Sequence, residues 1–311
     1  MMIKTLTLNP ALDKTIIVES FRLNQLNRIK KVHKDAGGKG INVSKMLKNL
    51  GQPSRAAGFL GGAAGDYIKS EVEKMGIETE FVETAEETRT NTKMVDPVNN
   101  TFTDLNEAGA FIVKENIAEL KEKIFKDLKK DDILVLAGSV PAGVEDDIYY
   151  RLIKIAAEKG VKTILDADGP LFRAGIKAAP TLIKPNEHEL GLHFKEEFKD
   201  LKTMIRKAES LLDLGIEMIM LSLGKEGAVF ITAAEKYRIE PLKLDVKSTV
   251  GAGDAMVAGL AFGLENKLSL EEMLKTAAAC SSATLIREGT EMGSREDTAR
   301  LKKAVRAAKI C

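Results

Sequence analysis

One acidic residue, Asp254, follows a run of small residues at the start of a predicted helix. The run is Ser248–Gly253 (STVGAG), and an apolar helical pattern continues beyond it. Because small residues leave the N–H groups of a helix start open, this segment predicts a hole for an anion such as a phosphoryl group. A carboxylate beside such a hole suits a general base that takes a proton from an attacking hydroxyl. The alternative is a carboxylate that only stabilises the helix dipole.

A second glycine-rich segment, Gly37–Ser44 (GGKGINVS), also enters a helical pattern. Glycine lets a ligand approach the backbone, and free N–H groups at a helix start favour anions or hydroxyl oxygens. Lys39 and Asn42 add directional donors. The segment predicts a binding loop, although a helix entry that only needs glycine flexibility has the same pattern.

Two further polar segments follow predicted strands. In Lys184–Glu189 (KPNEHE), Asn186 and Glu189 are three residues apart and share one side of a helical turn. This pair suits water-mediated Mg²⁺ binding, and it equally suits a capping box with Asn186 as the N-cap. Ser222–Gly227 (SLGKEG) is either a hairpin turn or, at the end of a parallel strand, part of a nucleotide site.

The absence of several motifs disfavours some classes of enzyme and of metal site. There is no G-x-x-x-x-G-K-[ST] loop and no protein-kinase catalytic loop. The 3 histidines and 2 cysteines show no metal-ligand spacing. Cys280 lies in an apolar helical run and is expected to be a small core residue, and Cys311 is the last residue. No disulfide framework is predicted.

The composition is that of a globular protein without an obvious macromolecular partner. The chain has 311 residues, 44% of them apolar and 30% charged, and its net charge is +1. There is no tryptophan and only 5% of residues are aromatic, which disfavours a base-stacking surface. No signal-peptide or membrane-spanning stretch is visible. We therefore expect a cytoplasmic protein that binds neither nucleic acid nor membranes.

The elements that must position these residues alternate along the chain. Helical periodicity separates the apolar runs, so we predict one α/β domain over residues 1–311, with a mainly parallel sheet flanked by helices. The predicted strands are Ile3–Leu8, Arg55–Leu60, Ile133–Ala137, Val161–Asp166, Thr181–Lys184 and Met218–Leu223. Predicted helices include Glu145–Lys159, Leu201–Leu214, Ala252–Glu265 and Leu270–Arg287.

Two stretches, Asp13–Asp35 and Thr88–Asn106, break this alternation. Each contains strand-like pieces joined by a polar turn, with no helix between them. They are too polar to be core strands. We therefore predict a small antiparallel β lid, built from about residues 13–35 and 88–106, beside the main sheet.

In this order the motifs resemble those of the ribokinase-like sugar kinases of the phosphofructokinase B type. AGGKGINVS, with Gly51 and Gly61 downstream, resembles the N-terminal signature of that family, and STVGAGDAMVAGL resembles its C-terminal signature. Asn186 to Glu189 is similar to its Asn-x-x-Glu motif. The segments TLNPALD, TRTN and TDLNE resemble the branch that contains 1-phosphofructokinases and tagatose-6-phosphate kinases. The resemblance covers essentially the whole chain.

The resemblance implies ATP-dependent phosphoryl transfer to a ketohexose phosphate, with fructose 1-phosphate expected first and tagatose 6-phosphate or fructose 6-phosphate as alternatives. Asp254 would be the base, and the amides of Gly251, Ala252, Gly253 and Asp254 would stabilise the transferred group. Sugar hydroxyls would be held by Asp13, Gly38 and Asn42, and the sugar phosphate by Lys39, Arg89 and Ser139. ATP would contact Lys184, Asn186, Ser222, Gly224 and Gly227, and Glu189 would hold Mg²⁺ through water.

The resemblance also implies a homodimer formed through the lids, with Arg28 or Lys30 reaching the site of the partner subunit.

Two other classes of function remain open. One is a nicotinamide-dependent oxidoreductase, suggested by Gly251-x-Gly253, although Met256 stands where a third small residue should pack. The other is a sugar-phosphate sensor without catalytic activity.

Overall fold

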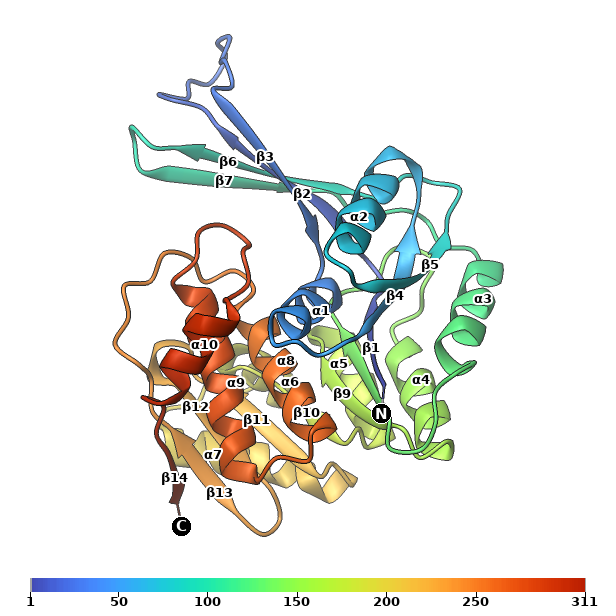
Figure 1. Ribbon diagram of the computed structural model, residues 1–311, viewed down its shortest axis with the longest axis vertical. Helices are drawn as coiled ribbons and strands as arrows, with labels where there is room; N and C mark the ends of the chain where they lie inside the picture. The colour runs from blue at the N-terminus through green and yellow to red at the C-terminus, as the bar shows by residue number, and fades with distance from the viewer. Residues whose placement is uncertain (1, 311) are drawn as a thin grey trace.

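A ten-stranded sheet forms the centre of the molecule, in the order β14-β13-β12-β11-β10-β9-β8-β1-β4-β5. A computed structural model describes residues 2–310 (Figure 1). The strands from β11 to β5 are parallel, and β12 to β14 add an antiparallel edge. Their bounds are β1 Ile3–Thr7, β4 Arg55–Leu60, β5 Glu78–Glu83, β8 Ile133–Ala137, β9 Lys162–Asp166, β10 Leu182–Ile183, β11 Met218–Ser222, β12 Ala228–Ile231, β13 Lys236–Ile239 and β14 Ala307–Ile310.

The central strands are apolar throughout because both faces of the sheet are covered. In β8, Val135 and Ala137 pack into the core on one face, while Leu134 and Leu136 pack into the core on the other. Such strands read as continuous apolar runs. The predicted α/β fold with a mainly parallel sheet is confirmed, and β4 and β8 have the predicted bounds.

Helices cover the two faces in two groups (Figure 1). One group is α1 Lys39–Asn49, α8 Ala252–Glu265, α9 Leu270–Leu285 and α10 Arg295–Lys302. The other is α3 Lys114–Phe125, α4 Ile148–Glu158, α5 Gly169–Gly175, α6 Glu187–Phe194 and α7 Leu201–Glu209. The 3₁₀ turns are η1 Ile176–Ala178, η2 Ser210–Leu214 and η3 Gly224–Glu226, so the predicted helix Leu201–Leu214 ends in a 3₁₀ turn. Cys280 is buried in α9, as predicted, and Cys311 lies outside the described residues.

The lid is a separate four-stranded sheet in the order β3-β2-β6-β7, which projects away from the main sheet (Figure 1). Its strands are β2 Ala11–Ile17, β3 Lys31–Gly37, β6 Thr90–Asp96 and β7 Thr101–Asn106, and α2 Gly62–Lys74 packs against its base. Each predicted hairpin is antiparallel, but the two hairpins join through parallel pairing of β2 with β6. The lid is therefore mixed, which corrects the expectation of a wholly antiparallel sheet.

Within residues 2–310, the structure has no helix with the length and apolar character needed to cross a bilayer.

Candidate active site

A cavity of about 280 Å³ lies where the carboxyl ends of β1, β8 and β9 meet the base of the lid. The chain crosses from β1 to β4 on one side and reaches β8 on the other, so this point is a topological switch of the sheet, where ligands of open α/β folds bind. The cavity brings together the predicted base, Asp254, and all the residues predicted to bind substrate: Asp13, Gly38, Lys39, Asn42, Arg89 and Ser139.

The glycines before α1 let the lid and the helix approach each other. Gly38 is the N-cap of α1 and has φ 131°, a conformation that residues with side chains rarely adopt. A Cβ on Gly37 would lie 2.0 Å from Oδ2 of Asp13, so the carboxylate rests directly on this glycine. The loop predicted from Gly37–Ser44 therefore lines the cavity and also needs glycine for its shape.

Asp254 lies buried at the start of α8, the helix with the predicted bounds Ala252–Glu265. The N-cap is Gly251, in the left-handed region at φ 76°, and no side chain caps this helix end. Oδ2 of Asp254 accepts a hydrogen bond from Nδ2 of Asn42 at 2.8 Å. Burial, and next the charge of Asp166, raise the pKa of Asp254 to about 6. A carboxylate with this pKa is suited to accept a proton near neutral pH.

Two amide oxygens in the cavity have no partner among the described residues. They are Oδ1 of Asn42 and Oδ1 of Asn91, and Asn42 is only 8% exposed. Each Asn donates its Nδ2 instead, Asn42 to Asp254 and Asn91 to Asp13 at 3.2 Å. Since buried polar atoms are nearly always hydrogen-bonded, these oxygens fit a ligand with several hydroxyl groups.

Asp166, at the end of β9, holds two lysines together. Its Oδ1 lies 3.2 Å from Nζ of Lys39 and 3.4 Å from Nζ of Lys184. Burial disfavours the carboxylate, but the charges of Lys184 and Lys39 outweigh it and lower the pKa of Asp166. Burial likewise opposes the charge of Lys39, yet the neighbouring carboxylates raise its pKa overall. The two lysine side chains are thus held beside one shared carboxylate.

Arg89 enters the cavity from the base of the lid. Its guanidinium donates to the backbone oxygen of Asn9 at 3.0 Å and to that of Glu107 at 3.2 Å. Burial lowers its pKa, and the Asp13 carboxylate opposes this effect. These contacts orient the guanidinium before any ligand binds. A fixed guanidinium fork is suited to a phosphate.

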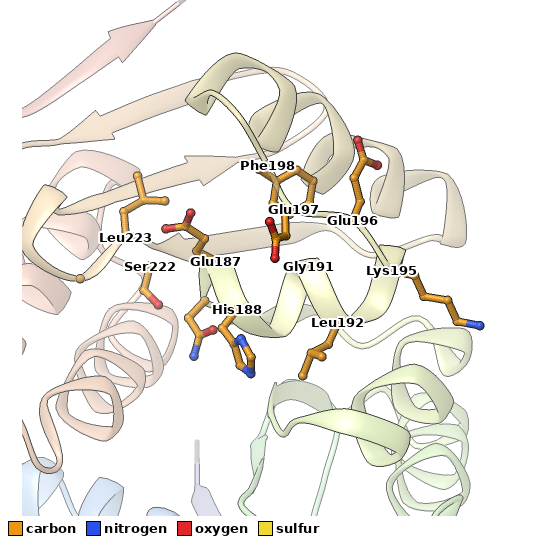
Figure 2. Close-up of a pocket in the computed structure, with 12 residues that line it drawn as sticks. Glu187, His188, Gly191, Leu192, Lys195, Glu196, Glu197, Phe198, Ser222 and Leu223 are labelled. Atoms are coloured by element: carbon orange, nitrogen blue, oxygen red, sulfur yellow. The ribbon is translucent and has the colours of Figure 1, made fainter.

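A larger groove of about 970 Å³ lies between α6 and the end of β11 (Figure 2). Three predicted nucleotide contacts line it: Asn186, Ser222 and Gly224. Figure 2 shows Ser222 at the end of the strand, with His188 and Leu192 projecting from the same side of α6. Gly227 does not line this groove. It has φ 86° in the turn before β12, where a Cβ would lie 2.2 Å from the backbone oxygen of Ile239.

Lys184 directly follows β10 and stands two residues before Asn186 of the groove. It is buried, and its Nζ lies 3.4 Å from the position that a Cβ on Gly253 would occupy. An ammonium group therefore stands beside the first turn of α8, whose N–H groups have no partners within the helix. The combination is suited to an anion lying between the groove and Asp254.

Asn186 and Glu189 form the predicted capping box of α6. The Asn186 side chain accepts from the N–H of Glu189 at 2.8 Å, and the Glu189 carboxylate accepts from the N–H of Asn186 at 2.9 Å. Residues 2–310 contain no group of three acidic, His or Cys side chains that could hold a metal ion. A Mg²⁺ bound mainly by water and phosphate oxygens needs no such group, so Glu189 fits a contact through water.

Sequence reasoning did not assign several residues that the structure places at the site. Asp166 contacts both lysines, while Asn9, Asn91 and Asp168 line the cavity. Asp166 is the last residue of a predicted parallel strand and Asp168 follows it, and the rule that ligands bind at the carboxyl ends of such strands would have found them. Asn91 pairs in register with Asp13 across β2 and β6, which no local pattern reveals.

Comparison with known proteins identifies the class that this fold and cavity define. Residues 6–297 match the model of the pfkB family carbohydrate kinases. The chain belongs to this family. Its relatives include enzymes with two different substrates in their names, so the family alone leaves the acceptor open.

A 1-phosphofructokinase from Borreliella burgdorferi is 38% identical over 92% of this chain and 92% of its own length. A tagatose-6-phosphate kinase from Staphylococcus epidermidis is 36% identical over 89% of this chain and 90% of its own. A structure of phosphofructokinase-2 from Escherichia coli superimposes with a TM-score of 0.93 at 28% identity, over 97% of this chain and 98% of that one. Another structure of that enzyme is of a tetrameric inhibited form.

Proposed function

We propose that this carbohydrate kinase transfers the γ-phosphoryl group of ATP to a ketohexose phosphate, with fructose 1-phosphate as the preferred acceptor and fructose 1,6-bisphosphate and ADP as products. The buried Asp254 carboxylate carries the proposal. It lies in the sugar-sized cavity, at the first turn of α8 and close to the two lysines held by Asp166.

In the proposed reaction, the acceptor hydroxyl gives its proton to Asp254 as its oxygen bonds to the γ-phosphorus. The bond from that phosphorus to the bridging oxygen of ADP breaks at the same time. Lys184 and the amides of Gly251–Asp254 would stabilise the charge on the transferred group, and Mg²⁺ would supply further charge when bound. Catalysis then rests on positioning and electrostatics.

The charge of the groove suggests how ATP would lie. Glu187, Glu196 and Glu197 line it together with one lysine, Lys195, so the triphosphate is disfavoured there. The nucleoside would occupy the groove beside Ser222 and Gly224. The phosphates would then extend toward Lys184, with Glu189 holding Mg²⁺ through water.

The choice of acceptor is tested by measuring ADP release with Mg-ATP and a panel of sugars. Fructose 1-phosphate accepts at C6, whereas fructose 6-phosphate and tagatose 6-phosphate accept at C1. A furanose with groups at both ends presents a similar shape in both cases, so one arrangement of Arg89 and Asp254 serves all three. A dominant kcat/KM for fructose 1-phosphate supports the proposal, and preference for a 6-phosphate would select the alternative acceptor.

The two other classes of function have less support. A dinucleotide fingerprint joins a strand directly to a helix, but residues 240–250, which precede α8, contain no strand. A sensor without activity has no need of a buried base. Release of no ADP with any sugar of the panel, together with sugar-phosphate binding, would favour the sensor.

Arg89→Ala should raise the KM for the sugar phosphate by about 10- to 100-fold and leave kcat within a few fold, because a charge-assisted phosphate contact is lost. Steady-state kinetics against the sugar phosphate measures this split. Arg151→Ala, which removes a surface arginine paired with Glu145 and Asp147, is the control. An unchanged KM in Arg89→Ala would place the phosphate site elsewhere.

The rate should fall on the acid side of pH 6. Because burial raises the pKa of Asp254 to about 6 and the base acts in its ionised form, kcat/KM should fall about tenfold per pH unit well below that value. A phosphate also titrates near pH 6. The pH dependence of the residual activity of Asp254→Asn separates the Asp254 carboxylate from the phosphate. If the fall in rate at acid pH persists unchanged in this variant, it is due to the phosphate of the substrate.

We further propose that the enzyme is a homodimer formed through the lids. Phe102 and Val32 lie in the outer part of the lid and are 68% and 46% exposed. They stand in different strands and on opposite faces of a sheet that projects from the body (Figure 1). Their exposure on a sheet that projects from the body is consistent with an interface between two lids. The tetrameric form of the Escherichia coli relative is consistent with assembly. The contribution of Arg28 or Lys30 to a partner site stays a prediction.

Phe102→Asp should shift the protein toward monomer, because a carboxylate would have to be desolvated in the interface. Sedimentation velocity over a range of concentrations measures the change. Leu214→Asp, at a 43% exposed leucine of η2, is the control on the main body. A Phe102→Asp protein with the same sedimentation coefficient as the wild type would rule out an interface at this part of the lid.

A further inference from the structure

Lys45 is a buried cation beside the cavity that the proposed reaction does not use. It lies in the middle of α1, three residues after Asn42, and is 8% exposed. Its Nζ donates a short hydrogen bond to the backbone oxygen of Ala36, near the end of lid strand β3. A lysine is rarely buried unless its charge is compensated, so this placement calls for an explanation.

The surroundings of Lys45 are acidic. Burial lowers the pKa of Lys45, and four acidic groups oppose this effect by favouring its charged form: Asp35 on β3, Asp13 on β2, Asp254 on α8 and Glu71 on α2. Burial, with a smaller contribution from the charge of Asp35, raises the pKa of Asp13, and the hydrogen bond from Asn91 and the charges of Lys45 and Arg89 oppose this effect. Lys45 is therefore the cation of α1 that acts on Asp13, whereas Lys39 at the start of the same helix pairs with Asp166.

A series of contacts connects Lys45 to Asp13, which lines the cavity. Nζ of Lys45 donates to the backbone oxygen of Ala36, and Gly37 is the next residue in the chain. The carboxylate of Asp13 rests on Gly37, and Asn91 donates to it from the other side at 3.2 Å. A change at Lys45 would thus alter both the charge near Asp13 and the backbone against which it packs.

We propose that Lys45 is a positioning residue for the sugar, which holds the end of β3 in place and balances the negative charge of Asp13 so that this carboxylate accepts hydrogen bonds from sugar hydroxyls. The identity of the sugar rests on the proposed function. The hold on β3 does not, because it follows from the contacts within the chain.

Three substitutions separate the charge of Lys45 from its hydrogen bond. Lys45→Met removes both, Lys45→Gln keeps a donor without the charge, and Lys45→Arg keeps both. Lys48→Met is the matched control, because Lys48 lies one turn further along α1, is exposed, and also donates to a backbone oxygen, that of Gly76. Thermal unfolding checks that each variant is folded, and Lys45→Gln and Lys45→Arg remain available if Lys45→Met is not.

The first measurement is calorimetric binding of fructose 1-phosphate without ATP, between pH 5.5 and 8. We expect Lys45→Met and Lys45→Gln to weaken binding about tenfold at neutral pH, which corresponds to one lost charge-assisted contact. The loss should grow toward acid pH, because Asp13 takes up a proton more readily without the nearby cation. Lys45→Arg should stay within about threefold of wild type. Equal binding by wild type, Lys45→Met and Lys45→Gln would overturn the proposal.

The second measurement is hydrogen exchange of the peptide that contains Ala36 and Gly37, with no ligand present. Exchange should become faster in Lys45→Met than in wild type and stay unchanged in Lys48→Met. Unchanged exchange in Lys45→Met would overturn the positioning role whatever sugar is bound. The wild type could bind no sugar phosphate while Lys45→Met still exchanged faster than the wild type. In that case the proposed substrate would be wrong, and the hold of Lys45 on the lid would stand.

Discussion

Replacing Asp254 with asparagine is expected to lower kcat by about 10²- to 10⁴-fold while the affinity for ATP changes little. Asparagine keeps the shape of the side chain and an oxygen for the hydrogen bond from Asn42, but it cannot take the proton of the acceptor hydroxyl. Single-turnover measurements of phosphoryl transfer report the chemical step, and nucleotide binding is measured separately.

The stability of Asp254→Asn distinguishes a base from a structural carboxylate. A carboxylate whose pKa is raised in the folded state destabilises the protein above its unfolded pKa, so removing the Asp254 charge should not lower the melting temperature at neutral pH. Asp297→Asn is the matched control, since Asp297 occupies the same position in the first turn of α10. That control should lose stability and keep its rate. Near-normal turnover in Asp254→Asn would disprove the assignment of the base.

Asp166→Asn should lower the free energy of unfolding by about 2–4 kcal/mol, because the buried Lys184 and the partly buried Lys39 would lose their shared counter-ion. It should also reduce kcat/KM, since both ammonium groups lose the contact that fixes them. Urea unfolding at neutral pH measures the first effect. Because the pKa of Asp166 is lowered in the folded state, its stabilising contribution is present above its unfolded pKa and is lost as the pH falls below that value.

Asp131→Asn provides the control for a pair at the surface. Asp131 lies 3.8 Å from Lys162, and their side chains are 50% and 34% exposed. Such a pair contributes about 0–1 kcal/mol. Equal losses in the two variants would mean that the cluster around Asp166 behaves as an ordinary surface pair and has no special part in fixing the lysines.

The sequence predicts the main sheet well because its strands and helices differ in local pattern. The run Ile133–Ala137 is apolar at every position, so only a doubly covered strand accommodates it, and α8 begins where glycine and small residues precede a long apolar stretch. The edge strands β13 and β14 were not predicted. Both are only four residues long; β13 alternates charged residues, Lys236 and Arg238, with apolar ones, and β14 has one charged residue, Lys309, so local patterns do not separate them from loops.

The residues of the candidate site also differ in whether a local pattern predicts them. Asp254, Lys39 and Asn42 stand in glycine-rich helix starts, where the local pattern itself implies a ligand. Asp166 looks like the polar end of an ordinary strand until the fold places two lysines against it. The parallel pairing of β2 with β6 depends on the register of distant strands, so the sequence predicts the two hairpins and not how they join.

The parallel pairing also affects the order in which the chain reaches its final form. Asp13 and Asn91 are 78 residues apart, and α1, β4, α2 and β5 lie between them. Each hairpin joins strands that are separated only by residues 18–30 or 97–100, whereas joining β2 to β6 must bring more distant segments together at a greater cost in chain entropy. The side of the cavity formed by Asp13 and Asn91 is therefore expected to form late. It follows the two separate hairpins and the folding of the strands that lie between them in the sequence. A newly made chain would then acquire much of its core before it can hold its substrate.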